Sequence, residues 1–106
     1  MKALVTGASG FVGGAVVRRA RELGWEVRGI GRRPLADPAY VSLDLTLPFE
    51  LDFHPDVVIH AAARSSPWGR RKEFEAQNVT ATRHVLDFCA MHGRPHLIHI
   101  STAAVL

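Results

Sequence analysis

One glycine-rich turn constrains the fold more than any other feature of this sequence. It reads TGASGFVG at residues 6–13, and it follows a short apolar stretch at residues 2–5 with the character of a buried strand. After the turn, apolar residues recur at helical spacing from Phe11 to Leu23, at Val12, Val16 and Ala20. A strand that passes into a helix through glycines is the context in which such a turn binds a dinucleotide.

The three glycines have different expected tasks. Gly7 can adopt a backbone conformation that side chains disfavour, Gly10 lets the main chain approach a ligand, and Gly13 lets the helix pack on the strand. The unpaired amides at the helix start form an anion site suited to a diphosphate. The spacing is Gly-x-x-Gly-x-x-Gly rather than the commoner Gly-x-Gly-x-x-Gly, so a tight turn without a ligand is the alternative.

Length and composition limit the class of protein. The 106 residues suit one small domain, and no apolar run is long enough to span a membrane. The first residues lack the pattern of a signal peptide, so we expect a cytoplasmic protein with no membrane partner. The single cysteine, Cys89, excludes an intramolecular disulfide and lies in a helical apolar pattern typical of a core.

The basic character of the chain does not by itself indicate nucleic acid. The net charge is +3, but the arginines are scattered over several predicted elements and no aromatic platform accompanies them. A basic surface around an anionic cofactor explains the charge, and we expect no nucleic-acid partner. We also expect no metal site, because His96 and His99 are three residues apart on a strand and face opposite sides.

The rest of the chain alternates strands and helices. Strands are predicted at residues 25–31, 40–43, 57–60 and 96–100, with a turn of helix between Leu47 and Phe53 and a long helix from about Arg71 to Met91. One face of the long helix carries Phe74, Asn78, Ala81, Val85, Phe88 and Cys89. The pattern predicts an α/β fold, a Rossmann-type doubly wound parallel sheet of order 3-2-1-4-5 that stops after the fifth strand.

The unusual residues fall just past the carboxyl ends of the strands, where ligands bind in open α/β sheets. They are the glycine turn, Arg32 and Arg33, Asp44, the alanines at residues 61–63, and Ser101 with Thr102. Gly31 stands where an acid would hold the ribose hydroxyls of NAD, and the two arginines that follow it favour NADP. The alternative is that both guanidinium groups point into solvent.

Other positions allow two interpretations each. Asp44 either accepts a hydrogen bond from the adenine amino group or is a simple turn residue. Ala61, Ala62 and Ala63 either leave room for the cofactor or fill the core. Asn78 ties its helix to a neighbouring loop in preference to a catalytic role. The hydroxyls of Ser101 and Thr102 either bind a substrate carbonyl or cap the strand, and His60 is expected to complete its strand.

The sequence resembles the extended short-chain dehydrogenases/reductases, also called the NAD-dependent epimerase/dehydratase family. The matching motifs are TGASGFVG at 6–13, DL at 44–45, HAAA at 60–63, NVTATRHVL at 78–86 and HISTAAV at 99–105. The loop HAAARSSPWG at 60–69 is most similar to the 3β-hydroxysteroid dehydrogenase-like branch, which includes bacterial reductases of 3-keto acids.

The resemblance, together with the residues above, assigns a cofactor site and one catalytic hydroxyl. The cofactor-binding residues are Gly7, Ser9, Gly10, Phe11, Val12, Gly13, Arg32, Arg33, Asp44, Leu45, Ala61, Ala62, Ala63, Asn78 and Ser101. The catalytic residue is Thr102, and the expected cofactor is NADP, with NAD as the alternative.

The resemblance also implies a longer enzyme, in which residues 1–106 are the NAD(P)-binding Rossmann domain and a substrate domain follows. The family's Tyr-x-x-x-Lys pair is absent here: the only tyrosine is Tyr40, and Asp44 stands four residues on. We therefore expect the 106 residues alone to be inactive and prone to aggregate.

The expected activity of the whole protein is that of an NADP-dependent oxidoreductase acting on a small-molecule hydroxyl or ketone substrate. The alternatives are a nucleotide-sugar epimerase or dehydratase and a non-catalytic NADP-binding redox sensor. The family's dimers suggest that the outer face of the long helix pairs with a second copy.

Overall fold

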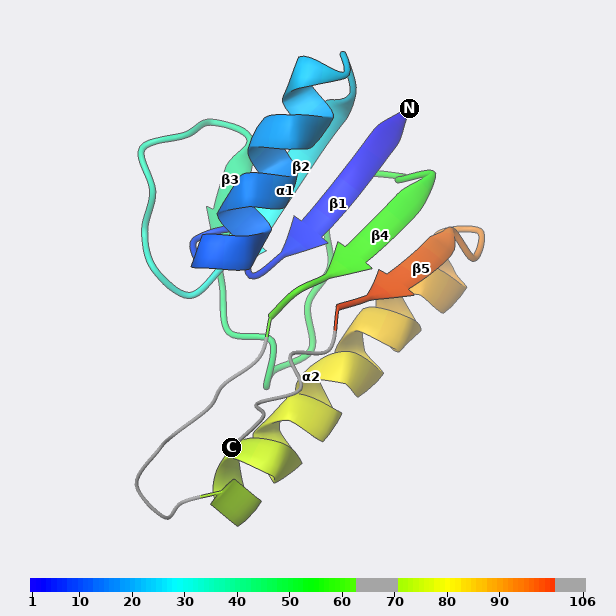
Figure 1. The fold of residues 1–106 in the computed structure, drawn as a ribbon. Coiled ribbons are helices and arrows are strands. Elements are labelled where there is room, and N and C mark those ends of the chain that lie inside the picture. The colour runs from blue at the N-terminus through cyan, green and yellow to red at the C-terminus, as the bar shows by residue number, and fades with distance from the viewer. Residues whose placement is uncertain (63–70, 101–106) are drawn as a thin grey trace.

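The computed structural model describes residues 1–62 and 71–100. Within them, five parallel strands form one sheet in the order β3-β2-β1-β4-β5, as Figure 1 shows. The elements along the chain are β1 (Lys2–Thr6), α1 (Phe11–Glu22), β2 (Glu26–Gly31), β3 (Tyr40–Ser42), β4 (Val57–His60), α2 (Arg71–Met91) and β5 (His96–His99). The predicted strand order is confirmed.

The two helices cover opposite faces of the sheet (Figure 1). Successive side chains of a strand point to opposite faces, so Leu4 packs with Val85 and Phe88 of α2, while Ala3 and Val5 pack toward α1. All three β1 residues are fully buried, as expected for a central strand that is covered on both faces. This is the doubly wound arrangement that the sequence predicts.

Helix α1 turns a different face to the sheet from the apolar face that the sequence predicts. Its buried residues are Gly13, Val17 and Ala20, whereas Val12 and Leu23 are exposed. The rotation follows from Gly13, because a Cβ at this position would overlap the carbonyl group of Gly7. The helix therefore makes its closest approach to the turn through a residue with no side chain. A pattern of apolar residues does not reveal such a contact.

The segment between β3 and β4 contains no helix, so the turn of helix predicted between Leu47 and Phe53 is wrong. A turn at Asp44 begins this segment instead: Thr46 donates from its N–H (2.9 Å) and its hydroxyl (2.7 Å) to Asp44 Oδ1, and the Leu47 N–H donates to the Asp44 carbonyl at 3.1 Å. Phe49, Leu51 and Phe53 pack irregularly against the α2 side of the sheet. An Asx-type turn and apolar anchoring thus replace helical hydrogen bonds here.

Helix α2 buries Ala81, Val85, Phe88 and Cys89, as predicted, while the side chain of Phe74 lies outside the described residues. Burial raises the pKa of the Cys89 thiol, which is consistent with a core position. Among the described residues, no helix has the length and apolar character needed to cross a membrane.

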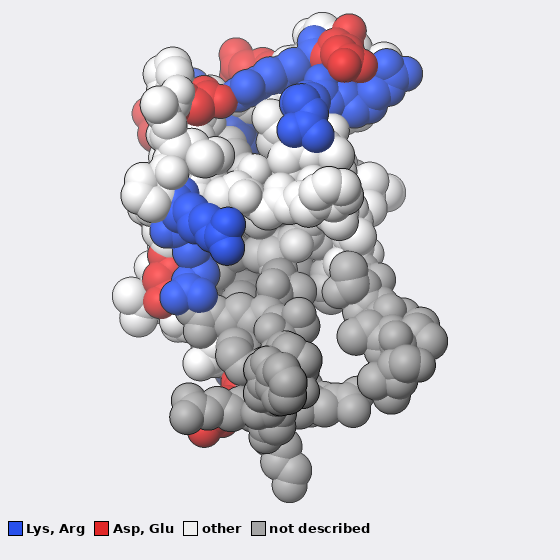
Figure 2. Space-filling model, turned by 60° about the vertical axis from the view of Figure 1, so that its left-hand side comes forward, with Lys and Arg blue, Asp and Glu red and all other residues white. Residues whose placement is uncertain are grey.

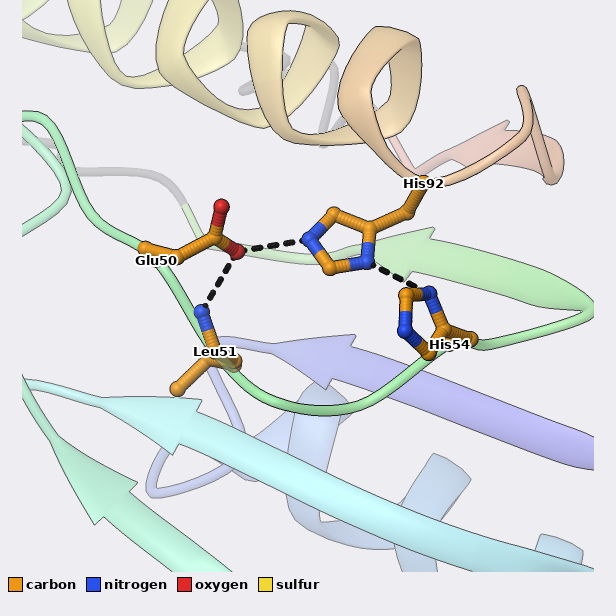
Figure 3. Close-up of polar contacts among 4 residues, drawn as sticks. All are labelled: Glu50, Leu51, His54 and His92. Atoms are coloured by element: carbon orange, nitrogen blue, oxygen red, sulfur yellow. Dashed lines mark hydrogen bonds and ion pairs between the residues drawn. The ribbon is translucent and has the colours of Figure 1, made fainter.

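A polar cluster ties the end of α2 to the segment before β4 (Figure 3). Glu50 Oε1 lies 2.6 Å from His92 Nε2 and accepts the Leu51 N–H at 2.8 Å, and both contacts lower the pKa of the carboxyl group. His92 Nδ1 lies 2.9 Å from His54 Nδ1. Because His54 and His92 precede β4 and β5, this cluster stands at the amino ends of the strands, opposite the edge that carries the candidate site.

Candidate functional site

A hollow of about 610 Å³ opens at the carboxyl ends of the strands. Its size falls in the range of small-molecule and cofactor sites. The described residues that line it are Gly7, Ser9, Gly10, Phe11, Gly31, Arg32, Arg33, Leu43, Asp44, Leu45, Thr46, Ala61, Ala62, Gln77, Asn78 and Ala81. Segments at the ends of β1, β2, β3 and β4, the start of α1 and part of α2 thus meet at one edge of the sheet.

Most of the residues proposed from the sequence line this hollow, and a few do not. Val12 and Gly13 lie in the first turn of α1 but do not line it. Ala63, Ser101 and Thr102 lie outside the described residues. The sequence reasoning missed Leu43, Thr46, Gln77 and Ala81. Gln77 and Ala81 share a helix face with Asn78, and this spacing was the signal that could have found them.

The glycine turn is packed too tightly to accept side chains. Gly7 has φ +68°, and a Cβ there would lie 2.8 Å from the carbonyl carbon of Ala61 and from the amide nitrogen of Ala62. Gly10 donates its N–H to the Gly7 carbonyl at 2.9 Å. The turn is therefore pressed between the end of β4 and the start of α1, with its main chain facing the hollow.

The start of α1 is arranged as an anion site. Gly10 is the N-cap residue and supplies no side-chain hydrogen bond, and no acidic residue stands in the first turn. No side chain of this turn therefore offsets the partial positive charge of the first amides of α1. Gly10 and Phe11, which stand at this helix start, line the hollow. This geometry suits a phosphate or diphosphate group.

A buried hydrogen-bond network anchors the floor of the hollow. Thr6 Oγ1 accepts the N–H groups of Ala61 and Ala62, both at 3.1 Å, and lies 2.6 Å from His60 Nδ1. Since two donors occupy the lone pairs of the hydroxyl, its proton is donated to His60 Nδ1. His60 therefore carries its own proton on Nε2, which lies 3.1 Å from Thr82 Oγ1. The network joins β1, β4 and α2.

His60 makes the stability of the protein depend on pH. Burial, and secondly the charge of the stacked His99 ring, lower the pKa of His60 from 6.5 to about 4. The unfolded chain binds a proton at His60 more readily than the folded protein does. The contribution of neutral His60 to the free energy of unfolding is therefore fully present above pH 6.5 and is lost as the pH falls from 6.5 to 4. The loss is about 2 kcal/mol at pH 5 and about 3 kcal/mol at pH 4.

Denaturant unfolding of the complete protein at pH 7 and pH 5 measures this loss. His60→Asn keeps an acceptor for the Thr6 hydroxyl but has no group that titrates in this range. We expect the wild-type protein to lose about 2 kcal/mol more than His60→Asn on this change of pH. Equal losses in the two proteins would contradict the account.

Arg32 and Arg33 border the hollow directly after β2. Both residues are exposed and both line the hollow, and the charge of Arg32 acts on Asp44 in the same lining. Asp44 is the acidic residue of the lining, and its pKa is lowered mainly by the hydroxyl and N–H of Thr46 and to a smaller extent by Arg32. Asp44 thus acts as a turn residue, whatever further contact it makes with a ligand.

Basic side chains are distributed in separate groups. On the face drawn in Figure 2, the upper Lys and Arg side chains are mixed with acidic ones, and a second basic group stands apart from them. Within residues 1–62 and 71–100, no three His, Cys, Asp or Glu residues are placed to hold a metal ion.

Comparisons with known proteins agree with this geometry. A model of the NAD dependent epimerase/dehydratase family matches residues 3–106. The 2-alkyl-3-oxoalkanoate reductase of Stenotrophomonas maltophilia is 32% identical over 120 aligned positions, which cover 99% of this chain and 34% of that protein. The chain thus spans about a third of the length of this relative.

Solved structures share the fold along nearly the whole chain. UDP-galactose 4-epimerase is 28% identical with a TM-score of 0.81, covering 99% of this chain and 39% of that one. A short-chain dehydrogenase/reductase superfamily protein from Agrobacterium tumefaciens, solved with bound NAD, is 30% identical with a TM-score of 0.76, covering 93% of this chain and 32% of that one. The match of the family model over residues 3–106, carried on a five-stranded sheet with a glycine cradle at its carboxyl edge, shows that this chain belongs to the NAD dependent epimerase/dehydratase family of extended short-chain dehydrogenases/reductases.

Proposed function

We propose that this chain is the NADP-binding part of an oxidoreductase that acts on a hydroxyl or ketone substrate. The observation that carries the proposal is the end of β2, where Gly31 offers no carboxylate and Arg32 and Arg33 border the hollow. An acid at this point would accept hydrogen bonds from the ribose of NAD and repel a 2′-phosphate. Guanidinium groups in its place favour the 2′-phosphate of NADP.

The residues of the hollow fit such a cofactor. The amides at the start of α1 would receive the diphosphate, and Gly7 and Gly10 line the hollow without side chains, which supports its close approach. Ala61 and Ala62 line the hollow without long side chains that would obstruct a bound dinucleotide. When bound, the cofactor supplies hydride transfer between its nicotinamide and the substrate.

Three further residues complete the proposal. Ala63 and Ser101 are assigned to the cofactor site, and Thr102 is assigned the hydroxyl that orients and polarises the substrate carbonyl. All three lie outside the described residues. The 106 residues contain no Tyr-x-x-x-Lys sequence, so the proposal assigns proton transfer to none of them.

Two substrate classes can be distinguished experimentally. The similarity to a protein named 2-alkyl-3-oxoalkanoate reductase supports a ketone substrate. The similarity to UDP-galactose 4-epimerase supports a nucleotide sugar as the second candidate. Consumption of NADPH with 3-oxo acids supports the first class, whereas conversion of a UDP-sugar without net consumption of NADPH supports the second.

Replacing both arginines by alanine is expected to remove the preference for NADPH. Two charge-assisted contacts to a phosphate are worth about 3 kcal/mol together, so the affinity for NADPH should fall by about 100-fold. The affinity for NADH should stay within about twofold, because NADH lacks the 2′-phosphate. Fluorescence titration of the complete protein with both cofactors measures the two dissociation constants.

The matched control replaces Arg18 and Arg19, two exposed arginines of α1 that do not line the hollow. The double change Arg18→Ala, Arg19→Ala removes the same net charge and should leave the cofactor preference intact. Binding of NADH by the wild-type protein as tightly as NADPH would refute the proposed cofactor choice.

We also propose that the complete protein forms a homodimer through the outer face of α2. Val79 and Leu86, seven residues apart on this helix, are 64% and 50% exposed. Covering such apolar side chains in a symmetric interface would stabilise a dimer. Sedimentation should show a dimer at micromolar concentration, which Leu86→Arg converts to a monomer; a strict monomer in the wild-type protein would contradict this.

A further inference from the structure

The ring of Tyr40 lies in a channel along β2. Gly29 and Gly31 are two residues apart on the face that α1 covers, and neither has a side chain to fill the space beside it. A Cβ at Gly29 would lie 3.2 Å from Tyr40 Cδ1, and a Cβ at Gly31 would lie 3.1 Å from Tyr40 Cε1. The Tyr40 ring, together with Ala8 beside Gly29, therefore occupies the volume that side chains at these two β2 positions would otherwise take.

The hydroxyl at the end of this channel reaches the segment that carries the arginines. Tyr40 donates a hydrogen bond to the carbonyl oxygen of Arg33. Ser42, two residues further along β3, donates to the carbonyl oxygen of Arg32 at 3.2 Å. Two side chains of β3, two positions apart, thus bind the two consecutive carbonyl groups that follow β2, immediately beside the hollow.

The rest of the loop between β2 and β3 is also held by hydrogen bonds. Asp37 accepts hydrogen bonds from the Arg21 guanidinium group of α1 at 2.8 Å and from the Ala39 N–H at 2.9 Å, and these contacts lower the pKa of its carboxyl group. The contacts of Asp37 fix the far end of the loop, while Tyr40 and Ser42 fix the end that faces the hollow. These contacts hold the backbone of Arg32 and Arg33 in place before any ligand arrives.

We propose that Tyr40 is the positioning residue that sets cofactor choice in this protein, with Ser42 in a supporting role. The inference rests on the proposed binding of NADP by Arg32 and Arg33. Tyr40 acts in two ways: its hydroxyl fixes the backbone of Arg33, and the same hydroxyl, with the adjoining edge of the ring, closes the position where an acid would stand. A Cβ at Gly31 would overlap the Tyr40 hydroxyl and lie 2.6 Å from Ser9 Oγ.

The physical reason is pre-organisation. A guanidinium group on a fixed backbone loses less conformational entropy when it binds a phosphate than one on a free loop. The exclusion of an acid from position 31 adds to the discrimination between NADPH and NADH, because no carboxylate is present to bind the ribose of NADH. Both effects act on the 2′ position of the cofactor and leave the diphosphate contacts unchanged.

The test uses Tyr40→Phe and Ser42→Ala in the complete protein, with NADPH and NADH as probes. Tyr40→Phe keeps the ring in its channel and removes one hydrogen bond, so the dissociation constant for NADPH should rise by about three- to tenfold. The dissociation constant for NADH should change by less than about twofold. Ser42→Ala should produce a smaller change of the same kind, and Ser42→Thr, which keeps a hydroxyl, should restore the wild-type preference.

Thr80→Ala is the matched control, because Thr80 also donates its hydroxyl to a backbone carbonyl, that of Ala76 at 3.0 Å on α2, and does not line the hollow. Thermal melting verifies that each variant folds. If Tyr40→Phe does not fold, Ser42→Ala still tests the positioning role, through the backbone of Arg32. An unchanged ratio of the two dissociation constants, or equal weakening of both cofactors, would overturn the positioning role. A wild-type preference for NADH would instead refute the proposed cofactor, which is a separate result.

Discussion

Gly7→Ala is expected to abolish cofactor binding and to destabilise the fold by about 3 kcal/mol or more, the sum of a strained left-handed backbone and an overpacked contact. The methyl group would lie 2.8 Å from backbone atoms of both Ala61 and Ala62. These atoms cannot move freely, because the N–H groups of Ala61 and Ala62 are bonded to Thr6 and Thr6 pairs with His60 in the sheet.

Gly24 provides the matched control for this substitution. It also has a positive φ, +81°, but a Cβ there would meet nothing within 4 Å. Gly24→Ala should therefore carry only the backbone strain, about 1 kcal/mol, and leave cofactor affinity unchanged. Thermal unfolding and NADPH titration compare the two variants. If Gly7→Ala is no more harmful than Gly24→Ala, the packing argument for the turn is wrong.

Thr6→Val should lower the stability by a comparable amount. Valine keeps the shape of threonine but removes the hydroxyl, which leaves the N–H groups of Ala61 and Ala62 and the Nδ1 of His60 without their partner. The buried His60 acceptor costs about 1–3 kcal/mol when it is left unsatisfied, and each lost hydrogen bond of the two half-buried N–H groups costs about 1 kcal/mol, so we expect a loss of about 3–5 kcal/mol in the free energy of unfolding. That loss is a large part of the stability of a small domain.

Thr6→Ser separates the hydroxyl from the methyl group. Serine keeps all three hydrogen bonds and loses one buried methyl, which costs about 1 kcal/mol. Denaturant unfolding should therefore rank the wild-type protein first, Thr6→Ser second and Thr6→Val last. A Thr6→Val protein as stable as Thr6→Ser would show that the network contributes little.

The sheet and the place of the site follow directly from the sequence. Each strand is a short apolar run, and parallel strands of alternating βα units bring their carboxyl ends to one edge. The glycine turn, Arg32, Arg33 and Asp44 therefore meet at the hollow although up to 37 positions separate them along the chain, from Gly7 to Asp44. Local pattern was sufficient because topology, not side-chain detail, brings these residues together.

The features that sequence reasoning missed depend on contacts between distant side chains or on residues without side chains. The sequence predicts close packing at Gly13, but it does not show that the contact of Gly13 with Gly7 sets the rotation of α1. The hydrogen bond of Thr6 to His60 spans 54 positions of the chain. The sequence predicts Tyr40 on a strand and outside any Tyr-x-x-x-Lys motif, and its place beside Arg33 is seen only when β2 and β3 are paired.

The most direct test of the account is a crystal structure of the complete protein with NADP⁺. The account predicts that the diphosphate lies against the amides at the start of α1, and that a guanidinium group of Arg32 or Arg33 binds the adenosine 2′-phosphate within hydrogen-bond distance. A 2′-phosphate directed away from both arginines, or a cofactor bound outside the hollow at the carboxyl ends of the strands, would contradict it.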